Sequence, residues 1–288
     1  MRTAIIIWGV TIMLTAQAGQ AEELGDDLRK ALVFYASFDE AVKADIAGGQ
    51  KTLNTRFNHP SEAGQFVFEE GFNERVFRIA KDRGLSGGAL EVVDVLPNNG
   101  RVFFPAQGNL PFDANGWGGA LSVWCQTDPN KLLKTTFCDP IQITQKGAGN
   151  GGLWFDFNNN KPRDMRHGAF PAVPEGEKPI AEDDPQAPIV HVPKIDWKAD
   201  DWHHVVLTWS GFDTGKPDAV SRIFIDGILI GEIRDRSLTM NWQLDKTGIY
   251  VAVNYIGLLD ELAIFRRPVS AEEVQELYRR PGLLKGSR

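Results

Sequence analysis

The stretch Ile223–Ile230, IFIDGILI, decides the fold class of this chain. Within it, the pair Asp226-Gly227 separates two short apolar runs. A two-residue type I′ turn needs positive φ at both central positions, and an Asp-Gly pair tolerates that conformation. The stretch therefore predicts a β-hairpin whose two arms are antiparallel strands.

Short apolar runs with period-two alternation recur on both sides of this hairpin, separated by clusters of Gly, Asn, Asp and Pro. The convincing helical pattern lies near the C-terminus, where Ser270 and Glu273 form a capping box and Val274 and Leu277 supply an apolar stripe. We therefore expect an all-β protein, an antiparallel two-sheet sandwich with a short C-terminal helix.

The first 21 residues have the layout of a secretory signal peptide. Arg2 gives a cationic start, an apolar run covers residues 4–14, and small residues follow up to Ala21. The run is shorter than the roughly 20 residues that a membrane-spanning helix needs. We predict a secreted or periplasmic protein, without membrane insertion after cleavage, whose residues 22–288 form a single domain.

Charge and cysteine content narrow the range of partners. The formal net charge is −7, and neither Lys nor Arg forms a concentrated block, which argues against nucleic acid and anionic lipid surfaces. After export, Cys125 and Cys138 would meet an oxidising compartment, so we predict a disulfide between them. It would stabilise the fold by about 3 kcal/mol. The alternative is two thiols, one buried in a strand and one exposed.

One segment interrupts the pattern of strands. Residues 159–198 contain seven prolines, several charges and few apolar runs of strand length. We expect a proline-rich insertion that leaves the sandwich. A loop of this length is usually either functional or disordered, and the composition leaves both open.

Several stretches, taken in order, resemble one known family. Trp202–Gly211 begins Trp-His-His-Val, the Asp226-Gly227 hairpin follows it, and residues 255–270 contain an Asp-Glu pair before the Ser-capped helix. Upstream, Phe34–Asp39 is similar to an opening strand, and Ala120–Trp124 to a strand that enters a concave sheet. Together they resemble the laminin-G-like jelly-roll domains of the concanavalin A-like lectin/glucanase superfamily. The resemblance implies two packed antiparallel sheets, one of them curved, with the first and last strands adjacent.

Alternation along residues 153–158 indicates a ligand-binding face. It sends the three apolar side chains to the core and Trp154, Asp156 and Asn158 to the opposite face. Trp124 and Gln126 share a face of another strand in the same way, and an aromatic ring beside hydrogen-bonding groups suits a sugar. The predicted ligand-binding residues are Trp124, Gln126, Trp154, Asp156, Asn158, Arg163 and Arg166, with the insertion as a rim. In the alternative, the insertion covers this face, the tryptophans form a second small core, and Asp156 pairs with Arg163 or Arg166.

Asp260 raises the question of a metal. Strand parity places it on the side of Leu262 and Ile264, where a lone buried carboxylate is costly. Domains of the resembled family often carry a structural calcium near the junction of the first and last strands, and Asp39 ends the first strand at about that place. We predict that Asp39 and Asp260 contribute oxygen ligands to a structural calcium. The alternative is that Asp260 caps a turn or pairs with an arginine.

No catalytic residues are predicted. Glycoside hydrolases of the related fold place their carboxylates as Glu-x-Asp-x-x-Glu on one strand, and no strand of this chain has that pattern. A phosphate loop and a His-Glu-x-x-His helix are also missing. We predict an exported, non-catalytic domain that binds a polysaccharide or glycoconjugate. A module that binds another envelope protein is the alternative, and a glycoside hydrolase of unusual type is a third reading.

Overall fold

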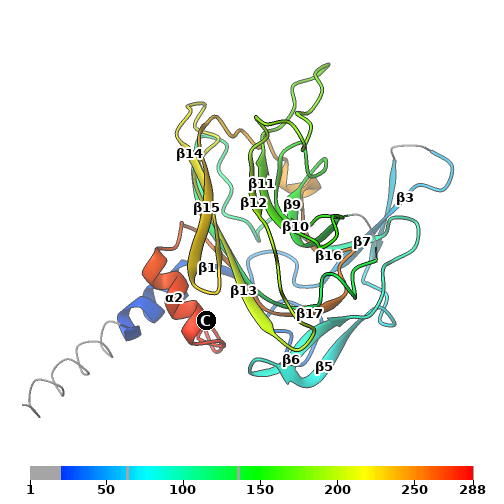
Figure 1. The fold of residues 1–288 in the computed structure, drawn as a ribbon, viewed down its shortest axis with the longest axis vertical. Helices are drawn as coiled ribbons and strands as arrows, with labels where there is room; N and C mark the ends of the chain where they lie inside the picture. Colours follow the sequence, from blue (N-terminus) through cyan, green and yellow to red (C-terminus); the bar gives the residue numbers. More distant parts are fainter. Residues whose placement is uncertain (1–20, 63–64, 135–136, 288) are drawn as a thin grey trace, which may run out of the picture.

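The computed structural model describes residues 21–62, 65–134 and 137–287. Most of this chain forms strands in two packed antiparallel sheets, which confirms the predicted all-β sandwich (Figure 1). The predicted signal peptide lies outside the described residues except for Ala21, so its assignment stays a prediction. Within the described ranges, none of the helices has both the length and the apolar character that crossing a membrane demands.

The first sheet contains the predicted hairpin. Its strands are β1 (Leu32–Ala36), β2 (Ile46–Ala47), β5 (Phe77–Gly84), β6 (Gly87–Val92), β8 (Trp117–Gln126), β13 (Trp202–Phe212), β14 (Ala219–Ile225), β15 (Ile228–Arg236) and β17 (Gly257–Phe265). They follow the order β15-β14-β13-β8-β17-β1-β2, and β6 pairs with both β17 and β5. Asp226 and Gly227 join β14 to β15 with φ values of 52° and 80°, as a type I′ turn requires.

The second sheet is assembled from strands that are far apart in the sequence. They are β3 (Asn54–Asn58), β4 (Phe66–Glu70), β7 (Arg101–Pro105), β9 (Cys138–Thr144), β10 (Gly152–Phe157), β11 (Met165–Phe170), β12 (Ile189–Val192) and β16 (Gly248–Val253). Their order is β12-β11-β10-β9-β16-β7-β3-β4. A short 3-10 helix, Leu244–Lys246, precedes β16.

The first and last strands are adjacent, as the resemblance implied. Phe34 of β1 lies opposite Ile264 of β17 in an antiparallel pair. Phe34 also packs edge-on against Phe104 of β7, with ring centroids 4.9 Å apart, so the contact crosses from one sheet to the other. Both ends of the described chain are thereby attached to the same core.

Alternation along β10 follows the prediction. Leu153, Phe155 and Phe157 are buried in the core between the sheets. Trp154 and Asp156 point to the other face of the second sheet, because successive side chains of a strand point to opposite faces. The outer face of this sheet is therefore the place to look for the predicted site.

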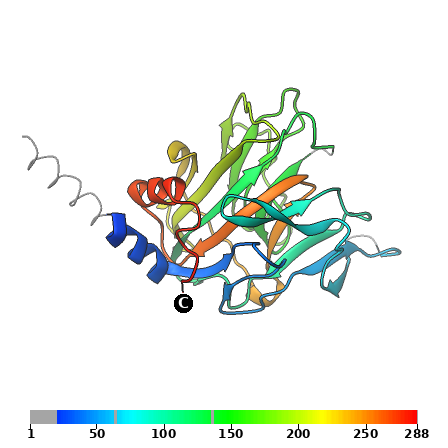
Figure 2. The same cartoon turned by 90° about the horizontal axis from the view of Figure 1, so that it is seen from below.

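Helices cover the outer face of the first sheet. The predicted C-terminal helix is α2 (Ala271–Arg279), and the Ser270 hydroxyl and Glu273 carboxylate form the expected capping box. A second helical segment covers residues 21–31. Figure 2 shows both on the same side of the molecule. They close an apolar cluster that includes Leu28, Phe265 and Leu277.

The proline-rich segment stays closer to the sandwich than expected. Residues 165–170 and 189–192 form β11 and β12, which extend the second sheet beyond β10. Alternation is hidden in β11 because an inward position is occupied by a polar residue, His167, and an outward one by Gly168. Only the stretches between these strands leave the sheet.

The predicted disulfide is wrong. Cys125 lies on β8 and Cys138 on β9, both side chains are buried, and no bond joins the two sulfur atoms. The two strands belong to opposite sheets. Both side chains pack in the apolar core between the sheets, where burial raises the pKa of the Cys125 thiol and so disfavours the thiolate that forms a disulfide.

Candidate functional site

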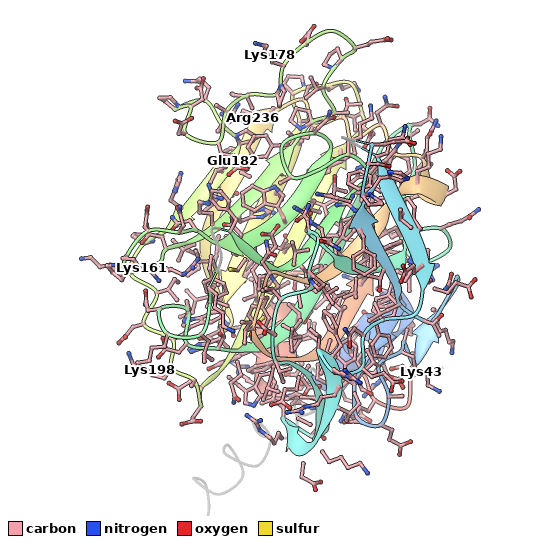
Figure 3. The ribbon with its side chains drawn as sticks, turned by 90° about the vertical axis from the view of Figure 1, so that its right-hand side faces the viewer. Lys43, Lys161, Lys178, Glu182, Lys198 and Arg236 are labelled. Carbon is pink, nitrogen blue, oxygen red and sulfur yellow. The ribbon has the colours of Figure 1, made fainter. Side chains whose placement is uncertain are left out.

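The outer faces of the two sheets differ in what covers them. Helices and the C-terminal residues bury the outer face of the first sheet, including Val206 and Phe224. The outward side chains of the second sheet instead border a cleft of about 690 Å³. Figure 3 is viewed from the side on which this sheet lies, with Glu182 labelled. The outer face of the second sheet therefore offers a hollow to a ligand.

Trp124 and Trp154 do not share one groove, contrary to the prediction. Trp124 lies on the first sheet, and its ring stacks 4.7 Å from His204 and 5.6 Å from Tyr278 of α2. Trp154 lies on the second sheet and borders the cleft. The groove predicted from both tryptophans cannot form, because β8 and β10 belong to opposite layers.

Three further residues of the predicted set make contacts away from the cleft. The Gln126 amide nitrogen donates to the Asp200 carbonyl oxygen at 3.3 Å. The Asn158 side-chain oxygen accepts from the backbone N–H of Asn160 at 2.8 Å. The Arg163 guanidinium is buried and donates to the Asn158 carbonyl oxygen at 2.6 Å. These hydrogen bonds hold turns and strand ends in place.

Asp156 and Arg166, also in the predicted set, form an ion pair in the wall of the cleft. Arg166 donates through Nε to Oδ1 at 3.0 Å and through Nη2 to Oδ2 at 2.5 Å. The same guanidinium lies 2.9 Å from a carboxylate oxygen of Glu182, which belongs to the proline-rich segment. Burial raises the pKa of Asp156 to about 6, against the opposing effect of Arg166. This is one of the pairings that the sequence left open.

Asp139 places a second buried carboxyl group near Asp156. It lies on β9, and the Gln142 side-chain nitrogen donates to it at 2.8 Å. Burial first, and then the charge of Asp156, raise the pKa of Asp139 well above its ordinary value. Asp139 therefore keeps its proton at pH values where an exposed aspartate is ionised.

Two arginines stand side by side in the cleft. Arg56 of β3 and Arg101 of β7 are direct cross-strand partners, so their side chains share the outer face. Arg56 is only 6 % exposed, and its guanidinium lies 4.0 Å from the ring centre of Phe66 and 5.0 Å from that of Tyr250. Burial lowers the pKa of Arg56, and the like charge of Arg101 adds to this effect.

Accessible aromatic rings extend from the cleft across the sheet. Phe66 and Phe68 of β4 are 41 % and 62 % exposed. Phe68 meets Phe103 edge-on at 6.1 Å, and these rings border a groove of about 520 Å³. Trp154, by contrast, is 1 % exposed, because the Arg166 guanidinium and the Phe170 ring lie against it. The open aromatic faces come from β4 instead of the predicted tryptophans.

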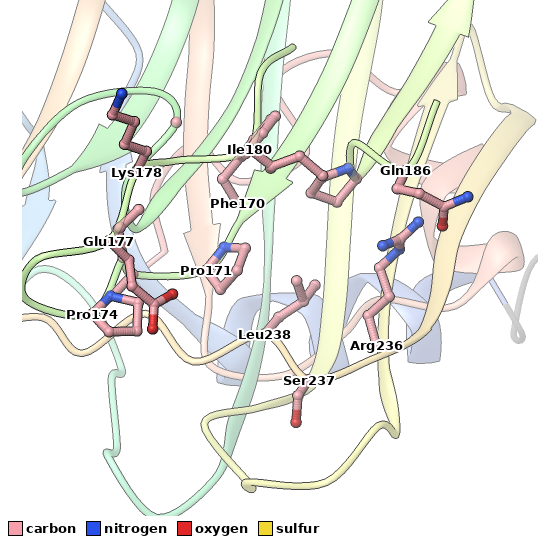
Figure 4. Close-up of a pocket in the computed structure, with 14 residues that line it drawn as sticks. Phe170, Pro171, Pro174, Glu177, Lys178, Ile180, Gln186, Arg236, Ser237 and Leu238 are labelled. Carbon is pink, nitrogen blue, oxygen red and sulfur yellow. The ribbon is translucent and has the colours of Figure 1, made fainter. Parts of the chain in front are cut away.

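A smaller hollow of about 440 Å³ lies between the proline-rich segment and the end of β15. Figure 4 shows its walls, which include Phe170, Pro171, Pro174 and Leu238. The proline-rich segment therefore borders this hollow and also supplies Glu182 to the larger cleft.

Asp260 lies on the outer side of β17, not on the inner side. Glu261 has a φ of 54°, and the register of β17 against β8 shifts between Asp260 and Ala263, which is the mark of a β-bulge. The bulge reverses the alternation on which the prediction relied. The Asp260 carboxylate accepts from the backbone N–H groups of Leu85 and Glu261 at 2.8 and 2.9 Å. Burial raises its pKa to about 8.

The residues around Asp39 and Asp260 do not fit a resident calcium ion. The Lys285 ammonium lies 2.7 Å from the Asp39 carboxylate and 3.3 Å from that of Glu261, so a cation of the chain itself stands among these acids. Backbone N–H groups already occupy the oxygens of Asp260. The described residues contain no cluster of three or more His, Cys, Asp or Glu side chains placed to hold a metal.

The sequence did not single out Arg56, Arg101, Asp139 or Gln142. Parity along residues 141–145 does place Gln142 on the face opposite Ile141 and Ile143, which was a usable signal, whereas Arg101 shares its face with the apolar Phe103. The missing information was strand order, because β3, β7, β16 and β9 become neighbours only in the folded chain.

Comparisons with solved structures show the same fold. The binding domain of botulinum neurotoxin serotype D matches with a TM-score of 0.55 at 11% identity, over 89% of this chain and 52% of that chain. The ligand binding domain of the same toxin, in complex with N-acetylneuraminic acid, matches with a TM-score of 0.51 at 10% identity, over 89% of this chain and 52% of that chain. The binding domain of Paraclostridial mosquitocidal protein 1 gives 0.51 at 14% identity, over 87% of this chain and 52% of that chain.

This chain thus spans about half the length of each of these three toxin chains. No curated protein matches it. The family model described as concanavalin A-like lectin/glucanases superfamily matches residues 97–275, more than half of the sequence and most of the strands described above. The chain therefore belongs to the concanavalin A-like lectin/glucanases superfamily.

Proposed function

We propose that this protein is an exported, non-catalytic recognition domain that binds a carbohydrate in the cleft of the second sheet. The observation that carries the proposal is the convergence of accessible aromatic rings and hydrogen-bonding side chains on one open sheet face. Sugars present C–H surfaces that pack on aromatic rings and hydroxyl groups that bond to amides and carboxylates. The aromatic face of Phe66 and the exposed side-chain amides of Asn58 and Asn99 supply both kinds of contact.

The dimensions of the site agree with this proposal. The cleft of about 690 Å³ and the groove of about 520 Å³ each lie within the roughly 300–1,000 Å³ typical of ligand pockets. Lys146 borders both, so a ligand longer than one sugar would extend from one hollow to the other. Amide side chains that line the cleft are Asn58, Asn99, Gln142 and Asn254.

Membership of a superfamily that includes lectins also supports carbohydrate as the ligand class. One toxin domain of the same fold has been solved with N-acetylneuraminic acid bound. Export remains part of the proposal on the strength of the cationic and apolar pattern in residues 1–21.

The polar groups of the cleft favour binding over hydrolysis. A nucleophilic or general-base carboxylate must reach its substrate, but both oxygens of Asp156 accept hydrogen bonds from Arg166. One carboxylate oxygen of Asp139 accepts a hydrogen bond from Gln142, and the group is buried. A carboxylate fixed in this way orients the hydrogen-bond donors beside it, such as the Arg166 guanidinium, and this suits the binding of a ligand.

A binding screen followed by one substitution tests the proposal. A glycan array identifies a ligand, and calorimetric titration then compares wild type with Phe66→Ala. Loss of the ring removes about 1–2 kcal/mol of apolar contact, so the affinity should fall by about 5- to 30-fold. Leu229→Ala is the matched control, because Leu229 is 47 % exposed on the first sheet, away from the cleft.

Three outcomes would contradict the proposal. Equal weakening by Leu229→Ala would place the binding surface on the hairpin of the first sheet, as a protein-interaction module would predict. An absence of binding across the array would show that the ligand is not one of the carbohydrates tested. Release of reducing ends from a bound polysaccharide, lost in Asp156→Asn, would instead identify a hydrolase.

A further inference from the structure

Arg56 is a buried cation without a carboxylate partner among the described residues. It is 6 % exposed, forms no ion pair there, and its Nε has no hydrogen-bond partner. Its guanidinium lies between the rings of Phe66 and Tyr250, and these contacts supply only part of what water would provide. Burial of a charge is costly unless the charge is paired. The Arg56 guanidinium therefore lacks a negatively charged partner among the described residues.

Arg101 doubles this positive charge. It is the direct cross-strand partner of Arg56, and like charges in that relation repel. Its own hydrogen bonds are long, 3.5 Å to the Gln142 side-chain oxygen and 3.4 Å to that of Asn99, and its Nε also lacks a partner in the part of the chain that the structure describes. An anion placed between the two guanidinium groups would relieve the repulsion and supply the missing acceptors.

The acids of the cleft do not cancel these two charges. Asp156 and Glu182 both pair with Arg166. Asp139 is the remaining buried acid, and it accepts a hydrogen bond from Gln142 instead of pairing with either arginine. Glu62 also lines the cleft, but it is exposed and forms no ion pair among the described residues. Gln142 stands between it and the arginines, since its nitrogen donates to Asp139 and its oxygen accepts from Arg101. The excess positive charge therefore stays on the side of the cleft formed by β3 and β7.

We propose that the glycan is acidic and that Arg56 and Arg101 together bind an oxyanion carried on one of its sugars. This inference rests on the proposed carbohydrate function and narrows its substrate class to sugars with a carboxylate or a sulfate group. Two adjacent guanidinium groups present planar pairs of N–H donors that match either oxyanion. The side-chain amides of Asn58 and Asn99 lie in the same cleft, where they are available to sugar hydroxyls.

The test uses three oligosaccharides of equal length in calorimetric titration at low salt. They are a galacturonic acid trisaccharide, a sulfated galactose trisaccharide and the neutral galactose trisaccharide. We expect at least one charged probe to bind more than about tenfold more tightly than the neutral one, with an affinity that weakens as salt is added. The preferred charged probe identifies the oxyanion.

Arg101→Gln separates a binding role from a structural one. Removing one of two like charges should leave the melting temperature of the ligand-free protein unchanged or raised, because repulsion is relieved. The same change should weaken the charged probe about tenfold and leave the neutral probe unaffected. Arg56→Gln should act in the same direction, and Arg234→Gln on β15 is the matched control, since Arg234 lies on the first sheet.

The failure of this inference differs from failure of the proposed function. If the neutral and charged probes bind alike, or if Arg101→Gln and Arg56→Gln leave the charged probe unaffected, the oxyanion site is wrong and carbohydrate binding stands. If none of the probes binds and the glycan array is also blank, both are wrong.

Discussion

His167 of β11 is fully buried between the two sheets. Its Nδ1 lies 2.8 Å from the Trp154 carbonyl oxygen and its Nε2 lies 2.8 Å from the Ser221 hydroxyl of β14. A carbonyl oxygen only accepts, so Nδ1 carries the proton and Nε2 accepts from Ser221, which the neutral imidazole satisfies. One polar side chain thus links the second sheet to the first. Burial lowers its pKa to about 4.

This lowered pKa predicts a pH-dependent contribution to stability. The folded-state pKa is below the unfolded value of 6.5, so the contribution of His167 is complete above that value and is lost as pH falls toward 4. Between pH 7 and pH 5 the loss is about 2 kcal/mol. Urea unfolding should show the stability advantage of wild type over His167→Gln shrinking by about that amount. The same advantage at both pH values would contradict the assignment.

The middle of β17 shows how a strand departs from the alternation of its side chains. Glu261 adopts a φ of 54°, which turns Asp260 outward and brings it beside the turn between β5 and β6. Lys285, in the C-terminal tail, forms ion pairs with Asp39 and Glu261 and so holds the tail against the first sheet. The Lys285 ammonium therefore compensates the negative charges beside β17.

Two measurements test this internal cation. Lys285→Met keeps much of the side-chain length but leaves the acids uncompensated, and we expect a loss of about 1–2 kcal/mol in the free energy of unfolding. Lys81→Met, at an exposed position on β5, should have little effect. Adding EDTA or calcium chloride should leave the melting temperature of wild type unchanged. A fall in melting temperature with EDTA would show that a metal stabilises the protein after all.

The elements that sequence predicted correctly are those specified locally. The Asp226-Gly227 turn and the Ser270 capping box depend on neighbouring residues, and alternation places the side chains of β10. Features that depend on distant strands were missed. The bulge at Glu261 has no local pattern that marks it, and nothing in residues 117–157 indicates that β8 enters one sheet while β9 and β10 enter the other.

At the scale of the whole molecule, the two layers have unequal outer faces. Helices and the tail close one, whereas Arg56, Arg101 and the rings of β4 border a hollow on the other. The sequence predicted the two layers, and it predicted Asp156, Trp154 and Arg166 on the face where the hollow lies. It missed the arginine pair, because residues 56 and 101 meet only through strand pairing.

The most direct test of the account is to map a bound acidic oligosaccharide onto the labelled protein by NMR chemical shifts. We predict that the largest shifts fall on the side chains and amides of Arg56, Arg101 and Gln142, in β3, β7 and β9, with little change around Trp124 and Leu229 on the first sheet. Shifts confined to α2 or to the β14–β15 hairpin would contradict this prediction, because they would place recognition on the side of the first sheet.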